Sequence, residues 1–215
     1  MTRARRLGRS FFDRDARDVA PELLHKVLVH RDPEVGRLAG RIVETEAYCG
    51  AEDPGSHAYR GRTLRNATMF GKPGCIYVYF TYGMHWCVNV VCGPGAEPHA
   101  VLLRAVIPLT GVEAMRSRRM RARTDRDLCR GPARLAQAFG FTRKHDGLDL
   151  LSGPVRILDD GTPPSDSPGV APRVGLASGK GEDLLWRWFV AGDPHVSRNG
   201  APMSRGVRTP GRESK

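Results

Sequence analysis

The sequence lacks the features of a membrane-spanning or secreted protein. Its 215 residues contain nothing close to the roughly 18 consecutive apolar residues that a spanning helix needs. The basic start at residues 2–9 is not followed by the apolar segment of a signal peptide. We therefore expect a soluble, intracellular protein with no membrane partner. Since 40% of the residues are hydrophobic, the chain can still bury a large core.

Cysteine is sparse and irregularly spaced. The five cysteines form no C-x-x-C pair, and no pair of nearby histidines stands at a metal-ligand spacing. An odd number of thiols at such spacings indicates neither a disulfide framework nor a structural zinc site. We therefore expect reduced, mostly packed thiols, no metal and no cofactor.

Lysine and acidic residues are also in short supply. Only 5 of the 34 basic residues are lysine, and 23 acidic residues leave a net charge of +11. Arginine presents a planar fork of donors that matches phosphate oxygens, so this excess favours nucleic acid over an acidic small molecule, with an anionic membrane as the rival partner. Residues 116–134 hold eight arginines against two aspartates. This run is either a solvated face or a phosphate-binding surface.

The order of patterned segments predicts one domain of mixed α+β class. Without an internal repeat or a second core, we expect a domain at residues 10–196, a basic arm at residues 1–9 and a basic, disordered tail at residues 197–215. Residues 51–74 read as a long structured loop. Strands are expected at residues 26–30, 38–48, 75–81, 84–92, 101–107 and 186–190, and helices at residues 15–24, 110–120 (from the capping pattern T-x-x-E) and 133–139.

The strand at residues 38–48 contains two glutamates. Strict alternation places Glu44 and Glu46 on one face with Ile42 and Tyr48. The simplest interpretation is a solvent-exposed acidic face of the strand. Glutamate is disfavoured in strands, however, and two of them in a strand of a protein with net charge +11 suggest a function or pairing with arginine. Two close carboxylates raise one pKa, which suits a general base near neutral pH.

The hairpin at residues 75–92 contains aromatic residues up to its turn, Tyr82-Gly83. A side chain at the tip has nothing to pack against unless a partner arrives. In a strongly basic protein, Tyr82 therefore suggests stacking on bases or a wedge between base steps.

Many ordered motifs are similar to one known family. They are residues 40–48, Glu52-Asp53, Ser56-His57, Arg65-Asn66, residues 69–74, Tyr77-Val-Tyr79, Tyr82-Gly83-Met84, Cys87-Val-Asn89, residues 101–105, residues 128–132 and residues 172–175. Over residues 7–197 the chain resembles the alkyladenine (3-methyladenine) DNA glycosylase family. The resemblance implies a single mixed domain with a curved antiparallel sheet, surrounding helices and a protruding β-hairpin.

The resemblance also implies a role for each matching position. Glu46 would activate a water for attack on the anomeric carbon, and Arg104 would help to hold that water. A nucleotide flipped out of the duplex would stack between Tyr48 and Tyr79, with His57 across from it. The remaining positions are Asn89 and Leu102 in the pocket floor, Tyr82 as the wedge in the DNA, and Thr63 and Arg65 on the DNA backbone.

The implied activity is base-excision repair of double-stranded DNA with damaged purines. An alkylated or deaminated purine would be released by hydrolysis, leaving an abasic site uncut, because no lysine near the motifs is a persuasive Schiff-base nucleophile. We expect a monomer in the cytoplasm at a bacterial nucleoid, or in the nucleus of a eukaryote. The alternatives are a non-catalytic nucleic-acid binding module and a relative that acts on RNA or a free nucleoside.

Overall fold

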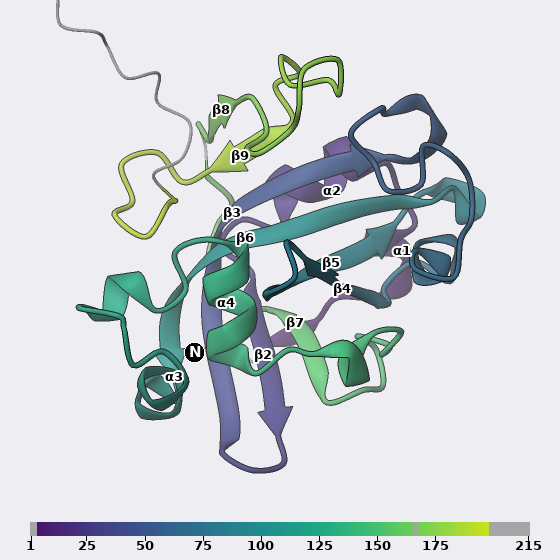
Figure 1. Cartoon of the computed structure of the whole chain (residues 1–215). Coiled ribbons are helices and arrows are strands. Elements are labelled where there is room, and N and C mark those ends of the chain that lie inside the picture. Colours follow the sequence, from purple (N-terminus) through teal and green to yellow (C-terminus); the bar gives the residue numbers. More distant parts are fainter. Residues whose placement is uncertain (1–3, 166, 198–215) are drawn as a thin grey trace, which may run out of the picture.

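An antiparallel sheet of nine strands forms the frame of the molecule (Figure 1). The computed structural model describes residues 4–165 and 167–197. The strands are β1 (Arg5–Arg6), β2 (Val27–Asp32), β3 (Gly36–Cys49), β4 (Ile76–Thr81), β5 (His85–Cys92), β6 (His99–Thr110), β7 (Val155–Asp159), β8 (Gly169–Ala171) and β9 (Arg187–Phe189). The helices are α1 (Arg9–Phe12), α2 (Ala16–Glu22), α3 (Val112–Arg118) and α4 (Pro132–Phe139).

The two longest strands, β3 and β6, lie side by side at the centre of the sheet. The strand order is β1-β7-β2-β3-β6-β5-β4, and β9 joins β3 beside β8. Strand β2 flanks β3 along residues 36–41, whereas β9 flanks it along residues 44–46. The segment with the two glutamates therefore has a paired strand on each side.

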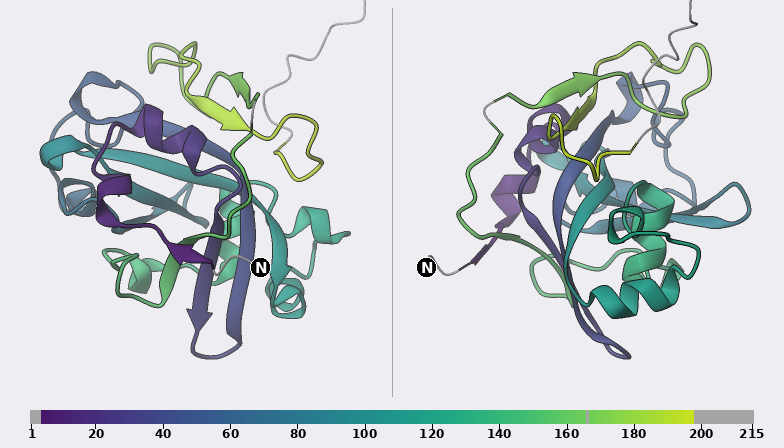
Figure 2. Two further views of the ribbon diagram at one scale, coloured as in Figure 1. Left: turned by 180° about the vertical axis from the view of Figure 1, so that it is seen from behind. Right: turned by 90° about the vertical axis from the view of Figure 1, so that its left-hand side faces the viewer.

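Helices cover both faces of this sheet, as Figure 2 shows. Helix α2 packs on β3 and β6, and α4 packs on β5 and β6. Helix α4 starts at Pro132 and ends before Gly140, whose φ of 71° is left-handed. The expected α+β class is confirmed. Within the described part of the chain, no helix has the length and apolar character to cross a membrane.

The start of α3 differs from the expected capping box. Thr110 is still the last residue of β6, and the helix begins after Gly111, whose φ is 76°. A Cβ on Gly111 would lie 2.4 Å from the Leu38 side chain. The close strand-to-helix corner therefore requires glycine, and it overrides the T-x-x-E signal.

Some residues that we assigned to the basic arm and to the tail make contacts with the folded domain. Arg5 and Arg6 pair with β7, and the Leu7 side chain is buried. Ser197 bonds to a buried glutamate in the centre of the sheet. The rest of the expected tail, residues 198–215, and residues 1–3 lie outside the described residues.

Two buried histidines lie between β2 and the segment that follows α4. The rings of His30 and His145 meet edge to face at 5.0 Å, and Phe141 stacks on His30 at 5.2 Å. The His30 Nδ1 is 2.9 Å from the Phe139 carbonyl oxygen. Burial lowers the pKa of both imidazoles below the usual 6.5. Both rings are therefore neutral at pH 7.

We expect acidification from about pH 8 to about pH 5.5 to lower the free energy of unfolding. Because the two pKa values are depressed in the folded state, the unfolded chain binds more protons. The contribution of the two neutral histidines to the free energy of unfolding is complete above the unfolded pKa of about 6.5. It is lost as the pH falls below that value. Urea unfolding across this range measures the effect. A flatter pH profile is expected for the double variant His30→Gln, His145→Gln, and an unchanged profile would contradict the assignment.

Candidate active site

Two irregularities in the β3–β6 pairing place the charged residues at the centre of the sheet. Ile42 pairs with Val106, and the next pair is Glu44 with Ala105. Val43 therefore has no partner in β6 and is an extra residue in β3. Thr45 then faces Leu103, which makes Arg104 an extra residue in β6. A bulge redirects side chains, and the expected strict alternation is therefore wrong at Ile42. Ile42 belongs to the same core cluster as Ala47, which alternation assigned to the other face.

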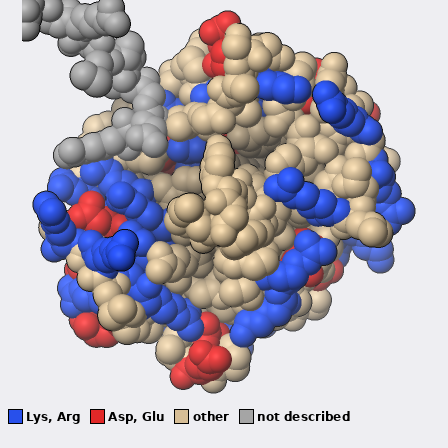
Figure 3. Space-filling view, in the orientation of Figure 1, with Lys and Arg blue, Asp and Glu red and all other residues tan. Residues whose placement is uncertain are grey.

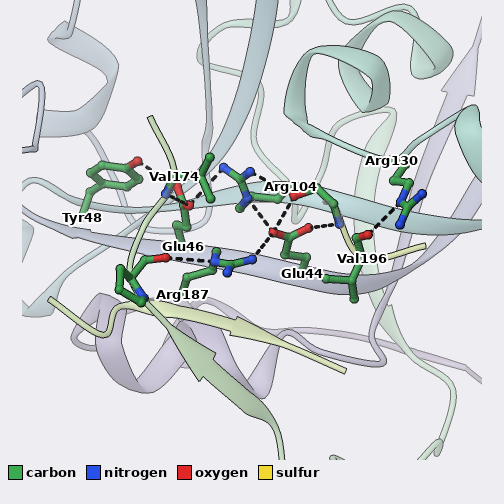
Figure 4. A network of polar contacts seen from close by, with 10 residues as sticks. Glu44, Glu46, Tyr48, Arg104, Arg130, Val174, Arg187 and Val196 are labelled. Atoms are coloured by element: carbon green, nitrogen blue, oxygen red, sulfur yellow. Dashed lines mark hydrogen bonds and ion pairs between the residues drawn. The ribbon is translucent and has the colours of Figure 1, made fainter. Parts of the chain in front are cut away.

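Glu44 and Glu46 are fully buried and share one arginine (Figure 4). The Nε of Arg104 donates to Glu44 Oε1 at 2.8 Å, and its Nη1 lies 3.0 Å from Glu46 Oε1. Arg187 on β9 donates to Glu44 Oε1 at 3.0 Å, and the Ser197 amide donates to Glu44 Oε2 at 2.7 Å. The network thus neutralises both carboxylates inside the sheet.

Glu46 has two further donors, which fix the direction of its carboxylate. The Val174 amide donates to Oε1 at 2.7 Å, and the Tyr48 hydroxyl donates to Oε2 at 2.9 Å. Burial raises the pKa of Glu46, and the Arg104 charge with these hydrogen bonds works in the opposite direction. An oriented carboxylate of raised pKa is the arrangement that a general base requires.

A cavity of about 210 Å³ lies next to the residues that hold this carboxylate, although Glu46 itself is not among its lining residues. Tyr48, Arg104 and Val174, which hold Glu46, are part of its wall. The sequence-predicted pocket residues are all brought together there: Tyr48, His57, Tyr79, Asn89 and Leu102 line the cavity, and Tyr82 lies at its rim. Tyr77 also lines the cavity, and its ring stacks on that of Tyr79 with the centroids 5.4 Å apart.

The aromatic wall carries no charge at neutral pH. Burial, together with the nearby Arg65 charge, lowers the pKa of His57, and its Nδ1 lies 3.0 Å from the Tyr77 hydroxyl. The His57 and Tyr79 rings meet edge to face at 4.5 Å. Burial raises the pKa of Tyr48 and Tyr79 well above 10. Neutral, electron-rich faces of this kind suit a flat, electron-poor ring.

The β4–β5 hairpin projects from the sheet (Figure 2, right). Its residues Tyr79, Thr81 and Tyr82 line the cavity. Tyr82 and Gly83 form its turn with φ values of 51° and 65°, and Met84 N donates to the Thr81 carbonyl. A positive φ is unusual for a tyrosine and is imposed by the tight turn. The Tyr82 side chain is 79% exposed.

A family model described as methylpurine-DNA glycosylase matches residues 10–194, which is most of the chain. The chain belongs to the methylpurine-DNA glycosylase family. This finding confirms the resemblance on which the site residues were assigned.

Several bacterial proteins are similar to this chain over most of their length. A protein of Burkholderia lata is 57% identical over 93% of this chain and 93% of its own length. A Streptomyces avermitilis protein is 50% identical over 94% and 96%, and one of Koribacter versatilis is 47% identical over 89% and 92%. Each bears the name "Putative 3-methyladenine DNA glycosylase".

A buried ion pair, which we did not assign from the sequence, supports the wall of the cavity. Arg173 binds both carboxylate oxygens of Asp53, at 2.5 and 2.8 Å, and both side chains have no exposed surface. The Arg173 guanidinium lies over the Tyr48 ring at 4.7 Å and over Trp186 at 4.9 Å. Asp53 and Arg173 both belong to the family motifs. Their role becomes visible only in the structure, where Asp53 holds Arg173 and Arg173 packs on the Tyr48 ring.

Basic residues surround the cavity on the face seen in Figure 3. Thr63 and Arg65, for which we expected contacts with the DNA backbone, are both exposed. A second hollow, here called the arginine hollow, adjoins the first through Arg104 and Pro132. Its volume is about 600 Å³, and it is lined by Arg104, Arg123, Arg126, Asp127, Arg130, Gly131, Pro132, Ala133, Arg134 and Ser197. The run at residues 116–134 therefore contributes a concave, positively charged surface.

Among the described residues, one group of side chains has the composition of a metal site: Asp15, Cys49 and His99. The Asp15 carboxylate is already bound to Arg17 through both oxygens and caps α2. Burial raises the pKa of the Cys49 thiol to about 12. A carboxylate held by a guanidinium and a protonated thiol are poor ligands, so we assign no metal here.

We expect Asp53→Asn to destabilise the protein by about 3–5 kcal/mol, since the substitution leaves the Arg173 charge buried without a counter-ion. Asp160→Asn is the matched control, because the Asp160–Arg41 pair is partly exposed, at 29% and 21%. This control should lose about 1 kcal/mol or less. Urea unfolding measures both variants, and equal losses would contradict the structural role of the Asp53–Arg173 pair.

Proposed function

We propose that the protein is a DNA glycosylase of base-excision repair. In this proposal it flips an alkylated or deaminated purine out of duplex DNA and hydrolyses the N-glycosidic bond, leaving an abasic site. The observation that carries the proposal is the oriented, buried Glu46 carboxylate behind an aromatic cavity with an exposed tyrosine at its rim. The family membership and the names of the relatives support a DNA glycosylase.

Glu46 acts as the general base in this mechanism. It takes a proton from a water molecule as the water oxygen bonds to C1′ of the flipped nucleotide. The bond from C1′ to the base nitrogen breaks, and the base leaves with the electron pair. Arg104 keeps Glu46 ionised and oriented, because the raised pKa that burial causes would otherwise leave more of the carboxyl protonated. Glu44 anchors Arg104 from the other side.

The cavity selects its base by stacking and by exclusion. An N-alkylated purine carries a positive charge, which both strengthens stacking on Tyr48 and Tyr79 and makes the base a better leaving group. Asn89, held by its Nδ2 contact of 3.2 Å with the Tyr77 carbonyl, lies in the cavity wall. An amide at this position disfavours guanine, whose 2-amino group it meets.

The surface around the cavity suits duplex DNA. Tyr82 at the hairpin tip fills the space that the flipped nucleotide leaves, and Thr63 and Arg65 contact the backbone. The arginine hollow offers additional positive charge for phosphates. One chain supplies the cavity, the general base Glu46 and the wedge Tyr82. The monomer is therefore the proposed working unit. The bacterial relatives favour a place in the cytoplasm, at the chromosome.

The proposed enzyme is monofunctional. The residues that line the cavity in the described part of the chain include no lysine, and a Schiff base requires an amine at C1′. Borohydride treatment during turnover should therefore trap no covalent protein–DNA complex, and trapping would reject hydrolysis as the mechanism.

We expect Glu46→Gln to slow base release about a hundredfold or more, because the amide cannot accept the proton of the water. Duplex affinity should be kept, since glutamine preserves the shape of the side chain. The measurement is base release from methylated DNA and from duplexes with one hypoxanthine or one ethenoadenine. Glu34→Gln, an exposed glutamate in the β2–β3 turn, is the control and should behave as wild type.

Each outcome of this experiment has a definite meaning. Release by the wild type and not by Glu46→Gln supports the proposed mechanism. If the wild-type protein binds all three DNA substrates and releases no base, the protein is a nucleic-acid binding module and the proposed activity is wrong.

We expect arginine-to-alanine substitutions at Arg123, Arg126 and Arg134 to reduce the salt dependence of DNA binding. Each lost phosphate contact should lower the slope of log affinity against log salt by about 0.9. Exposed Arg31 on β2 lies outside the arginine hollow, and its alanine variant serves as the control. Unchanged slopes in the three variants would remove the hollow from the DNA footprint.

A further inference from the structure

Next to the cavity, a short turn presents an apolar side chain to solvent. Leu64 is 95% exposed, more than the tyrosine at the hairpin tip. It lies in the segment of residues 61–66, here called the Leu64 turn, within the long connection between β3 and β4. Arg62, Thr63 and Arg65, its neighbours in the chain, are exposed as well. A leucine on such a polar segment has no structural partner of its own.

Buried Asn66 holds the Leu64 turn in its shape. Its Oδ1 accepts from the Thr63 amide at 2.6 Å and from the Thr63 hydroxyl at 3.0 Å. Its Nδ2 donates to the carbonyls of His57 and Gly61, at 2.8 and 3.0 Å. A turn braced by four hydrogen bonds keeps Leu64 exposed, because the backbone cannot relax to bury it.

Arg65 ties the Leu64 turn to the hairpin. Its Nη2 donates to the Phe80 carbonyl at 3.1 Å, and its guanidinium lies 5.8 Å from the centre of the Tyr79 ring. On the hairpin, Phe80 is 43%, Tyr82 79% and Met84 67% exposed. Exposed apolar side chains therefore occur on two segments that Arg65 connects, and each segment adjoins a residue of the cavity wall: Asn66 bonds to the His57 carbonyl, and Tyr82 lines the cavity. A patch of this kind marks a contact surface more often than scattered single residues do.

We propose that Leu64 is a second wedge, which enters the minor groove beside Tyr82 and contacts the base pair next to the flipped nucleotide. The proposal rests on the proposed function, because it assigns the patch to the same DNA. Leucine is among the side chains that proteins insert between base steps from the minor groove. Tyr82 replaces the flipped base, and Leu64 supports the strained neighbouring step.

The charge around the patch favours DNA as its occupant. Arginines at positions 60, 62 and 65 surround Leu64 in the chain, and basic groups encircle the uncharged centre of the face in Figure 3. An apolar contact ringed by cations matches a groove bordered by phosphates. The same ring disfavours a purely apolar protein partner, since the cations would have to lose water on contact.

The test compares two duplexes in the Glu46→Gln background, which keeps the lesion intact. Both carry one ethenoadenine, and a 2-aminopurine next to it reports unstacking by its fluorescence. In the first duplex the neighbouring pair is matched, and in the second it is mismatched. Leu64→Ala should weaken binding to the matched duplex about tenfold and reduce the fluorescence rise. The mismatched duplex should lose less than about twofold, because its step is already open.

Two further variants separate a wedge from a general contact. Leu64→Met should retain the binding affinity and the fluorescence rise, because it keeps an apolar side chain of similar size. Val35→Ala removes an aliphatic side chain that is 40% exposed in the β2–β3 turn, and it should have no effect. An equal loss on both duplexes, or no loss on either, would overturn the proposal.

Failure of the second wedge can be distinguished from failure of the proposed activity. Base release by wild type with no Leu64 effect rejects the second wedge alone. A Leu64 effect on binding in a protein that releases no base rejects the glycosylase activity, while the wedge is retained.

Discussion

The buried pair of glutamates in β3 is the constraint on which the rest of the structure depends. Burying two carboxylates in a sheet is highly unfavourable unless each has a counter-ion and hydrogen-bond donors. Arg104 serves both, because a bulge in β6 places it between them. Tyr48 donates to Glu46 from β3 itself, and the other donors, Val174, Arg187 and Ser197, come from residues 174–197. The hydrogen bonds to the two glutamates are therefore complete only with residues 174–197 in place across β3.

This arrangement prepares the site before any substrate is bound. Glu46 is oriented by Tyr48 and Val174, and Tyr48 is in turn held under the Arg173 guanidinium. The wall that would stack a base and the carboxylate that would activate water thus share the same supports. In the proposed function, preorganisation of this kind would favour reaction during the short time that a nucleotide spends out of the duplex.

The outer face combines features of different origin. The hairpin turn tolerates the positive φ of Tyr82, Asn66 braces the Leu64 turn, and residues 116–134 form one side of the arginine hollow. Each is locally stable, and Arg65 connects the first two. Under the proposed function, an apolar patch that is already held in place would contact DNA without first having to order its own loops.

The amino-acid sequence by itself predicted six of the nine strands, with β1, β7 and β8 not foreseen, the hairpin with its exposed tip and, through ordered motifs, the family. It also favoured a nucleic-acid partner and named residues that line the cavity. These features depend on local pattern and composition. It did not reveal the bulges that turn Ile42 to the other face and bring Arg104 to both glutamates, because register is a property of two strands together. It also did not reveal the Arg173–Asp53 support, the glycine corner before α3 or the brace at Asn66. Those interactions join residues that only the tertiary structure brings into contact, and their geometry decides which charges can be buried.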